Sequence, residues 1–340
     1  MTGTPSLGRS VGAVARWLGG AVILVFIVWR LGTGPFLHGV RAVDGRSLAL
    51  AAAIGFVTTV CAAWRWHLVA RGLGVALPLR KATAAYYRSQ FLNTVLPGGV
   101  LGDVDRAVRH GSEAGDVGRG LRAVAWERSA GQFVQVVLGL MVLLLLPSHV
   151  PTWLPLVLAA VLLGAFGGGL MLRGRAPRGK SRGARVFRAA ASDIREGLLA
   201  PHRGPGIALA SVVVVSGHLA TLILAARTAG AISPTVQLVP LAMLVLLATA
   251  VPTNIGGWGP REGVAAWAFG AAGLGAAQGV ATGTVYGLLS LAAISPAVPL
   301  LAASWLRRRR SPAEPLPPEF STSGPDLVPA AGPREGGVSG

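Results

Sequence analysis

Three small clusters of charged residues lie within the apolar part of this chain, and they are the best candidates for chemistry. The clusters are Asp103, Asp105 and Arg106; Glu127 and Arg128, followed by Gln132 and Gln135; and Arg261 and Glu262. Charges inside or beside membrane-type segments are expensive, so they often mark functional sites. Arginine is a planar, multidentate donor that suits a phosphate. The carboxylates either neutralise the arginines or act as general acids or bases. For any one cluster, simple ion pairing at a helix end is the alternative.

Two of the clusters follow glycine-rich segments that interrupt a helix. The first segment contains Asn93, Pro97, Gly98 and Gly99, and the second contains Pro252, Asn254, Gly256 and Gly257. In each, an arginine (Arg106 or Arg261) stands nine residues after the leading proline. Proline removes a backbone donor and glycine disfavours the helix, so both segments are predicted to break helices. Helices that begin near Asp103 and Arg261 would add free backbone N–H groups, which also favour an anion.

The composition indicates that lipid surrounds most of the chain. Of its 340 residues 52% are hydrophobic and only 13% are charged, and the mean hydropathy is +0.59. A soluble domain carries about a quarter charged residues. The net charge of +18 clusters beside apolar segments, as the positive-inside rule expects, so we predict no nucleic-acid partner. Residues 1–310 are predicted to form a membrane domain, and residues 311–340 a disordered cytoplasmic tail.

The apolar segments predict an all-α, polytopic membrane protein with about eight transmembrane segments, including two broken or re-entrant helical hairpins, and with both termini cytoplasmic. Spans are expected at 17–29, 47–68, 122–146, 152–172, 205–227 and 281–306, and further helices at 235–251 and 262–279. Only 14 uncharged residues separate Arg88 from Asp103, too few to cross a bilayer, so this segment is predicted to be re-entrant. The basic loop 173–203 is expected in the cytoplasm.

The sequence offers little support for catalysis or for a metal. Its one cysteine, Cys61, lies in an apolar segment, and its six histidines are scattered. One of these, His218, is expected to be a hydrogen-bonded packing residue in mid-span. There is no Walker-type loop, serine nucleophile motif or paired-aspartate motif. We therefore predict no catalytic residue, no metal and no cofactor.

The motifs together resemble those of the lysylphosphatidylglycerol synthase transmembrane, or flippase-like, family. The resemblance is carried by Leu96 to Gly99 with Gly102, Asp103 and Arg106, by Glu127 and Arg128, and by Pro252 to Glu262, and it covers roughly residues 10–306. It implies an eight-helix membrane domain with re-entrant elements. In the best understood members this domain translocates an amino-acylated phospholipid, and other relatives are associated with glycolipid or polyprenyl-linked pathways. Because no room remains after residue 306 for a soluble aminoacyl-transferase domain, the resemblance supports lipid movement and not lysine transfer.

The sequence therefore leads to the hypothesis of a multi-pass protein of the cytoplasmic membrane that binds an anionic-headgroup lipid and translocates it between leaflets. The predicted lipid-binding residues are Asn93, Pro97, Gly98, Gly99, Asp103, Arg106, Glu127, Arg128, Asn254, Gly256, Gly257, Arg261 and Glu262. Two alternatives stay open: a membrane-embedded transferase acting on a lipid-linked substrate, and a non-transporting accessory protein of envelope synthesis. Homo-oligomers and envelope-synthesis partners also stay open.

Overall fold

Long apolar helices form the framework of the fold. The computed structural model describes residues 22–96, 99–146, 188–249 and 259–302, with residues 156, 157, 159, 160 and 164. Four of the described helices are long and apolar enough to cross a membrane: α3 (Gly45–Gly72), α6 (Val117–Leu145), α9 (Gly204–Thr228) and α12 (Ala276–Ile294). A fifth candidate is the pair formed by Val22–Leu31 and α2 (Gly34–Ala42), which are bent by 96° relative to each other. The predicted all-α membrane fold is confirmed in this part of the chain.

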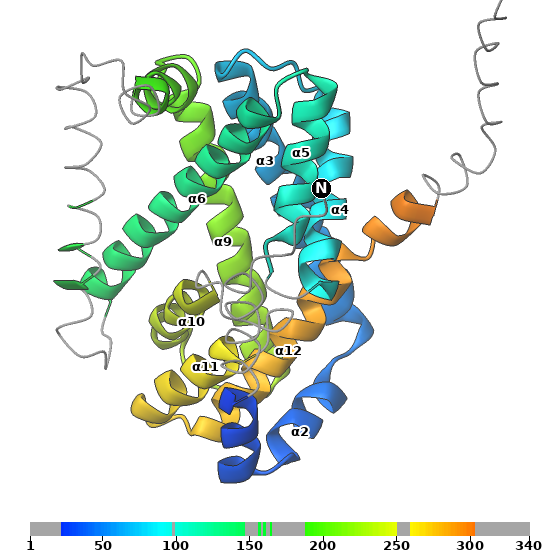
Figure 1. The fold of residues 1–340 in the computed structure, drawn as a ribbon. Coiled ribbons are helices and arrows are strands. Elements are labelled where there is room, and N and C mark those ends of the chain that lie inside the picture. The colour runs from blue at the N-terminus through cyan, green and yellow to red at the C-terminus, as the bar shows by residue number, and fades with distance from the viewer. Residues whose placement is uncertain are drawn as a thin grey trace, which may run out of the picture. The chain divides into compact units, whose positions relative to one another are not determined.

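Helix α3 has a defined start and lies among the other long helices. Asp44 caps its N-terminus by accepting a hydrogen bond of 2.8 Å from the backbone N–H of Ser47. It packs against both α9 and α12 (Figure 1). Small residues make these contacts close, since a Cβ added at Gly55 would lie 2.3 Å from the Cβ of Ala293 in the α12 segment. Helix α3 is thereby held in the middle of the helical assembly.

Two shorter helices form a hairpin around the first glycine-rich break. Helix α4 (Leu79–Val95) ends where Leu96 turns to an extended backbone, and α5 begins at Leu101 and runs to Glu113. Pro97 and Gly98 lie outside the described residues. Helix α5 packs against α4 on one side and against α6 on the other (Figure 1). The predicted helix break is confirmed, and its two arms return side by side.

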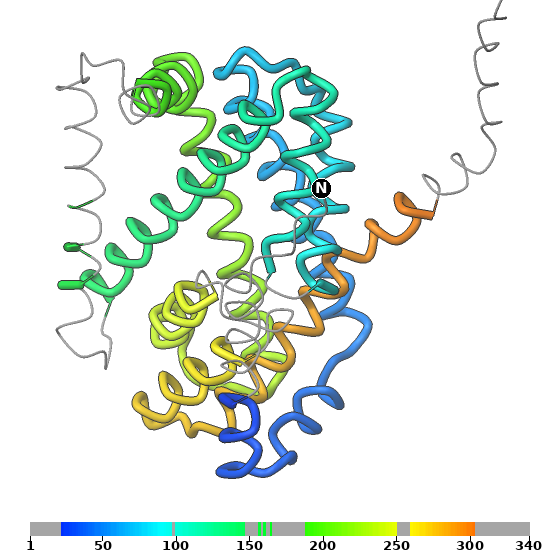
Figure 2. The backbone as a smooth tube through the Cα atoms, viewed as in Figure 1, coloured from blue at the N-terminus to red at the C-terminus, as the bar shows by residue number. Residues whose placement is uncertain are grey.

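The second half of the fold is built from α10 (Thr235–Thr249), α11 (Pro260–Ala271) and α12. Two helices are present in the regions predicted as 262–279 and 281–306, and the second is a candidate span, but the boundary predicted between them lies too late in the chain and is wrong. Helix α11 ends at Ala271, and Gly273 and Gly275 then adopt φ values of 75° and 89°, which side-chain-bearing residues rarely reach. Figure 2 follows the backbone through this turn into α12.

The other predicted segments have different outcomes. Helices α3, α6 and α9 confirm the spans expected at 47–68, 122–146 and 205–227. The segment 152–172 lies almost entirely outside the described residues, as do the basic stretch 173–187 and the tail 311–340. Within the rest of the basic loop a short π-helix, η1 (Asp193–Leu198), packs against α3 and α6. The number of eight spans and the side of each terminus stay predictions.

Candidate functional site

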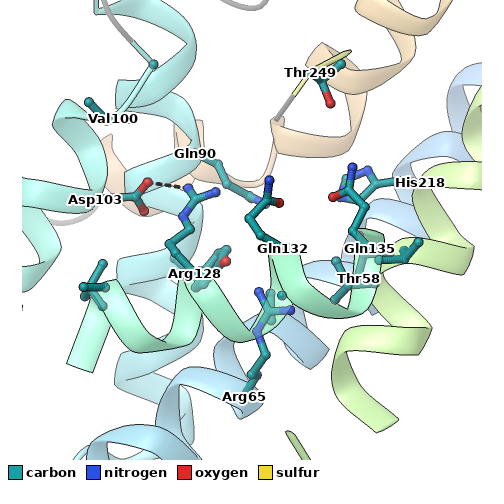
Figure 3. Close-up of a pocket in the computed structure, with 18 of the residues that line it drawn as sticks. Thr58, Arg65, Gln90, Val100, Asp103, Arg128, Gln132, Gln135, His218 and Thr249 are labelled. Atoms are coloured by element: carbon teal, nitrogen blue, oxygen red, sulfur yellow. Dashed lines mark hydrogen bonds and ion pairs between the residues drawn. The ribbon is translucent and has the colours of Figure 1, made fainter. Parts of the chain in front are cut away.

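A cavity of about 590 Å³ opens between α3, α4, α5, α6, α9, α10 and α12. Most of its wall is apolar, and the polar part of the lining consists of Thr58, Arg65, Tyr86, Gln90, Asp103, Arg128, Gln132, Gln135, His218, Thr249 and Tyr286 (Figure 3). Two helix faces contribute most of these groups: the α6 face with Arg128, Gln132 and Gln135, and the facing side of α4 and α5. A charged and amide-rich interior among apolar helices is typical of a site for a polar ligand at membrane depth.

Glu127 of α6 is the centre of the buried charge network behind this cavity. Its side chain is 0% exposed. One carboxylate oxygen accepts hydrogen bonds from Arg65 Nε at 2.9 Å and from the Tyr86 hydroxyl at 3.3 Å, and the other accepts from Arg106 Nη2 at 2.7 Å. A buried charge is tolerated when it is paired and hydrogen-bonded. Glu127 therefore ties α3, α4, α5 and α6 together through one carboxylate.

Arg106, one of the two predicted anion-binding arginines, is buried in this network. Its guanidinium carbon lies 4.6 Å from the ring centroid of Trp66 and 4.4 Å from that of Tyr86, and its Nε donates to Asp103 at 2.9 Å. Arg106 does not line the cavity. Nearby, His110 packs edge-on against Trp66, and burial lowers the pKa of its imidazole, so it is uncharged near pH 7. Arg106 is placed to hold α5 in position.

Asp103 joins the two arms of the α4–α5 hairpin. Its carboxylate accepts hydrogen bonds from Ser89 Oγ at 3.0 Å and Asn93 Nδ2 at 3.1 Å, both on α4. The Asn93 carbonyl oxygen in turn accepts from the backbone N–H of Gly102 at 2.7 Å, which satisfies one of the free donors at the start of α5. The structure thus brings the predicted site residues Asn93 and Asp103 together across the break.

Arg128 is the most exposed arginine of the charge network, and it faces the cavity. Its side chain is 47% exposed, lines the cavity and pairs with the Asp103 carboxylate (Figure 3). Arg65 also lines the cavity, but it is 6% exposed and is held by Glu127 and by Ser211, whose hydroxyl accepts from Nη1 at 3.1 Å. Arg65 is not among the residues that the sequence indicated for the site, although an arginine inside the predicted span 47–68 is a signal for it.

The charges of this network do not cancel. Its ion pairs join the arginines Arg65, Arg106 and Arg128 to the carboxylates Asp103 and Glu127. Three positive groups against two negative groups leave one positive charge in excess. Because Arg128 is the most exposed of the three, the excess charge is available to a ligand on the cavity wall. An anion bound there would complete the charge balance of the network.

The second predicted motif is only partly described. Glu262 is 0% exposed, and its carboxylate accepts from the backbone N–H of Gly259 at 2.7 Å and from Arg261 Nε at 2.9 Å. The Arg261 guanidinium carbon lies 5.6 Å from the ring centroid of Tyr286, which lines the cavity. Asn254, Gly256 and Gly257 lie outside the described residues. A joint site formed by Arg106 and Arg261 stays a prediction.

Uncharged polar residues complete the cavity wall. Gln132 and Gln135, which the sequence indicated as a polar patch, both line it, and so do Gln90 and Thr249, which the sequence did not single out. His218 lines the cavity as well, and its Nδ1 lies 3.4 Å from the Tyr286 hydroxyl. In the part of the chain that the structure describes, no group of three histidine, cysteine or acidic residues is arranged to hold a metal ion.

The long apolar helices define a multi-pass helical membrane protein, and the cavity gives it an internal site with charged and amide groups. Comparison with known families identifies it further: residues 12–297 match the model of the lysylphosphatidylglycerol synthase TM region, and the chain therefore belongs to this family. Neither the curated proteins nor the solved structures contain a match to it. Membership of this family indicates a role in the modification or transport of lipid.

Proposed function

We propose that this protein binds a lipid with an anionic headgroup at Arg128 and carries it between the leaflets of the cytoplasmic membrane. The observation that supports the proposal is the excess positive charge of the buried network. This charge reaches the cavity at Arg128, the exposed member of the network. The guanidinium group offers the bidentate donor geometry that a phosphate accepts. The proposal includes the predicted topology of about eight spans with both termini in the cytoplasm.

In this account Asp103 and the lipid phosphate compete for Arg128. When the cavity holds no lipid, the Asp103 carboxylate neutralises Arg128, and three other donors stabilise that carboxylate: Ser89, Asn93 and Arg106. A phosphate that enters takes the exposed side of Arg128 while Asp103 keeps its other partners. The polar groups of the cavity wall then take the place of water around the headgroup, because an unsolvated charge is costly in the hydrocarbon core. Exchange of one partner at Arg128 keeps binding reversible, as transport requires.

The arrangement of the carboxylates favours transport over the alternative of a membrane-embedded transferase. A general acid or base must come within hydrogen-bond reach of the substrate. Glu127 and Glu262 are both 0% exposed and hydrogen-bonded to arginines. Asp103 reaches the cavity, but it accepts hydrogen bonds from four side chains. None of the three carboxylates is thus poised to exchange a proton with a substrate.

Substituting Arg128→Ala is expected to slow lipid translocation about ten-fold, the loss expected when a charge-assisted hydrogen bond to a phosphate is removed. The matched control is Arg109→Ala. Arg109 is 45% exposed and, like Arg128, pairs with one carboxylate, but it lies outside the cavity lining. The measurement uses vesicles that contain the purified protein and fluorescent phosphatidylglycerol, with a membrane-impermeant quencher that reports how much of the lipid has changed leaflet.

The control variant is expected to keep the rate of the unchanged protein. Equal translocation rates for the Arg128→Ala variant and the Arg109→Ala variant, at equal protein per vesicle, would contradict the proposed function. Mass spectrometry of the vesicle lipids addresses the alternatives in the same samples. A transferase would produce a lipid of new mass, whereas a transporter changes only the sidedness. An accessory protein would leave both the mass and the sidedness unchanged.

A further inference from the structure

The cavity has a second polar region made of uncharged groups, beyond the charged pair. In the view of Figure 3, Asp103 and Arg128 lie at one side of the cavity, Gln135 and His218 at the other, and Gln132 between them. Gln90 and Thr249 belong to the same wall. A phosphate alone would occupy the charged side of the cavity and would leave these amide and hydroxyl groups without contacts to the ligand. The rest of a headgroup therefore has to match their chemistry.

The hydrogen bonds already made by these groups show what they can still offer. The Gln90 carbonyl oxygen accepts from Thr59 at 3.2 Å, which leaves its NH₂ for another acceptor. The Gln135 NH₂ donates to the Leu246 carbonyl at 2.8 Å, which leaves its own carbonyl oxygen for a donor. Gln132 makes no hydrogen bond to any residue that the structure describes, so it retains both. The wall thus presents both donors and acceptors.

This mixture suits hydroxyl groups and does not suit a cation. A hydroxyl both donates and accepts hydrogen bonds, whereas an ammonium group only donates and needs a negative partner when it is removed from bulk water. Of the described residues on the cavity wall, Asp103 alone carries a carboxylate, and it is already paired with Arg106 and Arg128. The excess positive charge of the network would also repel a second cation.

From this arrangement we propose that the lipid handled by this chain has a phosphate joined to an uncharged, hydroxyl-bearing headgroup, such as a phosphoglycerol or a phosphorylated sugar, and that a cationic aminoacyl headgroup is disfavoured. This inference rests on the proposed function, because it assigns the substrate class of the same cavity. The phosphate binds at Arg128, and the hydroxyl groups lie against Gln90, Gln132 and Gln135. The uncharged side of the cavity is therefore the region that determines headgroup specificity.

The test compares three probes with the same acyl chains: phosphatidylglycerol, its lysyl ester and phosphatidylethanol, a phosphodiester with the same single negative charge as phosphatidylglycerol but no headgroup hydroxyl groups. Their binding to the purified full chain in detergent is measured by native mass spectrometry. We expect phosphatidylglycerol to bind about ten-fold more tightly than the lysyl ester, whose ammonium groups find no free carboxylate in the cavity. We also expect it to bind several-fold more tightly than phosphatidylethanol, the difference that one or two additional hydrogen bonds produce.

The variant Gln132→Leu removes the cavity amide that has no other described partner. It is expected to reduce the affinity for phosphatidylglycerol several-fold, to the level of phosphatidylethanol, and to leave the affinity for phosphatidylethanol unchanged. The control is Gln237→Leu, an exposed glutamine of α10 outside the cavity lining, which should alter neither affinity. Both substitutions replace one exposed amide by an apolar group of similar size.

The outcomes separate this inference from the proposed function. Binding of the lysyl ester as tightly as phosphatidylglycerol would overturn the headgroup assignment, and so would a Gln132→Leu variant that weakens all three probes equally. Either result leaves the phosphate site at Arg128 intact. In contrast, an Arg128→Ala variant that binds phosphatidylglycerol and phosphatidylethanol as tightly as the unchanged protein does would refute the proposed function itself.

Discussion

The Glu127→Gln substitution is expected to destabilise the protein by about 3–5 kcal/mol, the cost of removing one partner from a buried ion pair. Glutamine has nearly the same shape as glutamate but no charge. Arg65 and Arg106 would then lose the carboxylate that they share, in surroundings where the side chains of both arginines are at most 6% exposed. The change is measured as a fall in the midpoint of thermal unfolding in detergent, at fixed lipid and protein concentrations.

A matched control exists on the protein surface. Asp105 also accepts hydrogen bonds from two arginines, Arg88 at 3.3 Å and Arg109 at 2.9 Å, but its side chain is 27% exposed and those of its partners are 30% and 45% exposed. Because solvent screens such pairs, Asp105→Asn is expected to cost less than about 1 kcal/mol. Equal falls in the unfolding midpoint for the two variants would show that Glu127 does not organise the helices as described.

The second large effect is expected at Gly102, where α4 and α5 come closest. A Cβ atom at this position would lie 2.1 Å from the Ser89 carbonyl oxygen and 2.9 Å from Asn93 Oδ1. The first of these atoms is backbone and cannot move without the helix. Gly102→Ala is therefore expected to force the hairpin apart at a cost of about 1–3 kcal/mol. Because Asp103 is the next residue, lipid translocation should fall as well.

Gly45→Ala provides the comparison for this steric effect. Gly45 is the first residue of α3, and a Cβ there would meet no atom within 4 Å. Alanine favours the helix more than glycine does, so this variant should be as stable as the unchanged protein or slightly more stable. Thermal unfolding and translocation are measured for both variants. A Gly102→Ala variant that matches Gly45→Ala in both measurements would contradict the close contact between α4 and α5.

The elements that the sequence predicted correctly are those controlled by local physical rules. Long apolar segments bounded by charges predicted α3, α6 and α9, because only a helix satisfies the backbone in lipid. The proline and glycines after Leu96 predicted the interruption between α4 and α5. The clustering of charges in apolar surroundings singled out Asp103, Glu127 and Arg128, and ion pairs through Arg106 connect their side chains. That these residues bind a lipid stays a prediction.

The features that the sequence did not predict depend on contacts between distant segments. Arg65 lies inside an apparently ordinary span, and its importance follows from Glu127, which is 62 positions away in the chain. The burial of Arg106 between Trp66 and Tyr86 likewise requires three helices to be in place. The boundary between α11 and α12 was misplaced because a run of alanine and glycine continues through Gly273 and Gly275 without a charge or a proline to mark the turn.

The measurement that tests the central claim most directly is the amount of phosphate-containing lipid that remains bound to the purified protein. The phosphate content and, by mass spectrometry, the identity of the bound lipid are determined for the unchanged chain, for Arg128→Ala and for Arg109→Ala, after the same exchange into detergent. We predict that the unchanged chain and the Arg109→Ala variant retain an anionic lipid, and that the Arg128→Ala variant loses most of it. Retention of the same lipid in the same amount by all three proteins would contradict an anion site at Arg128.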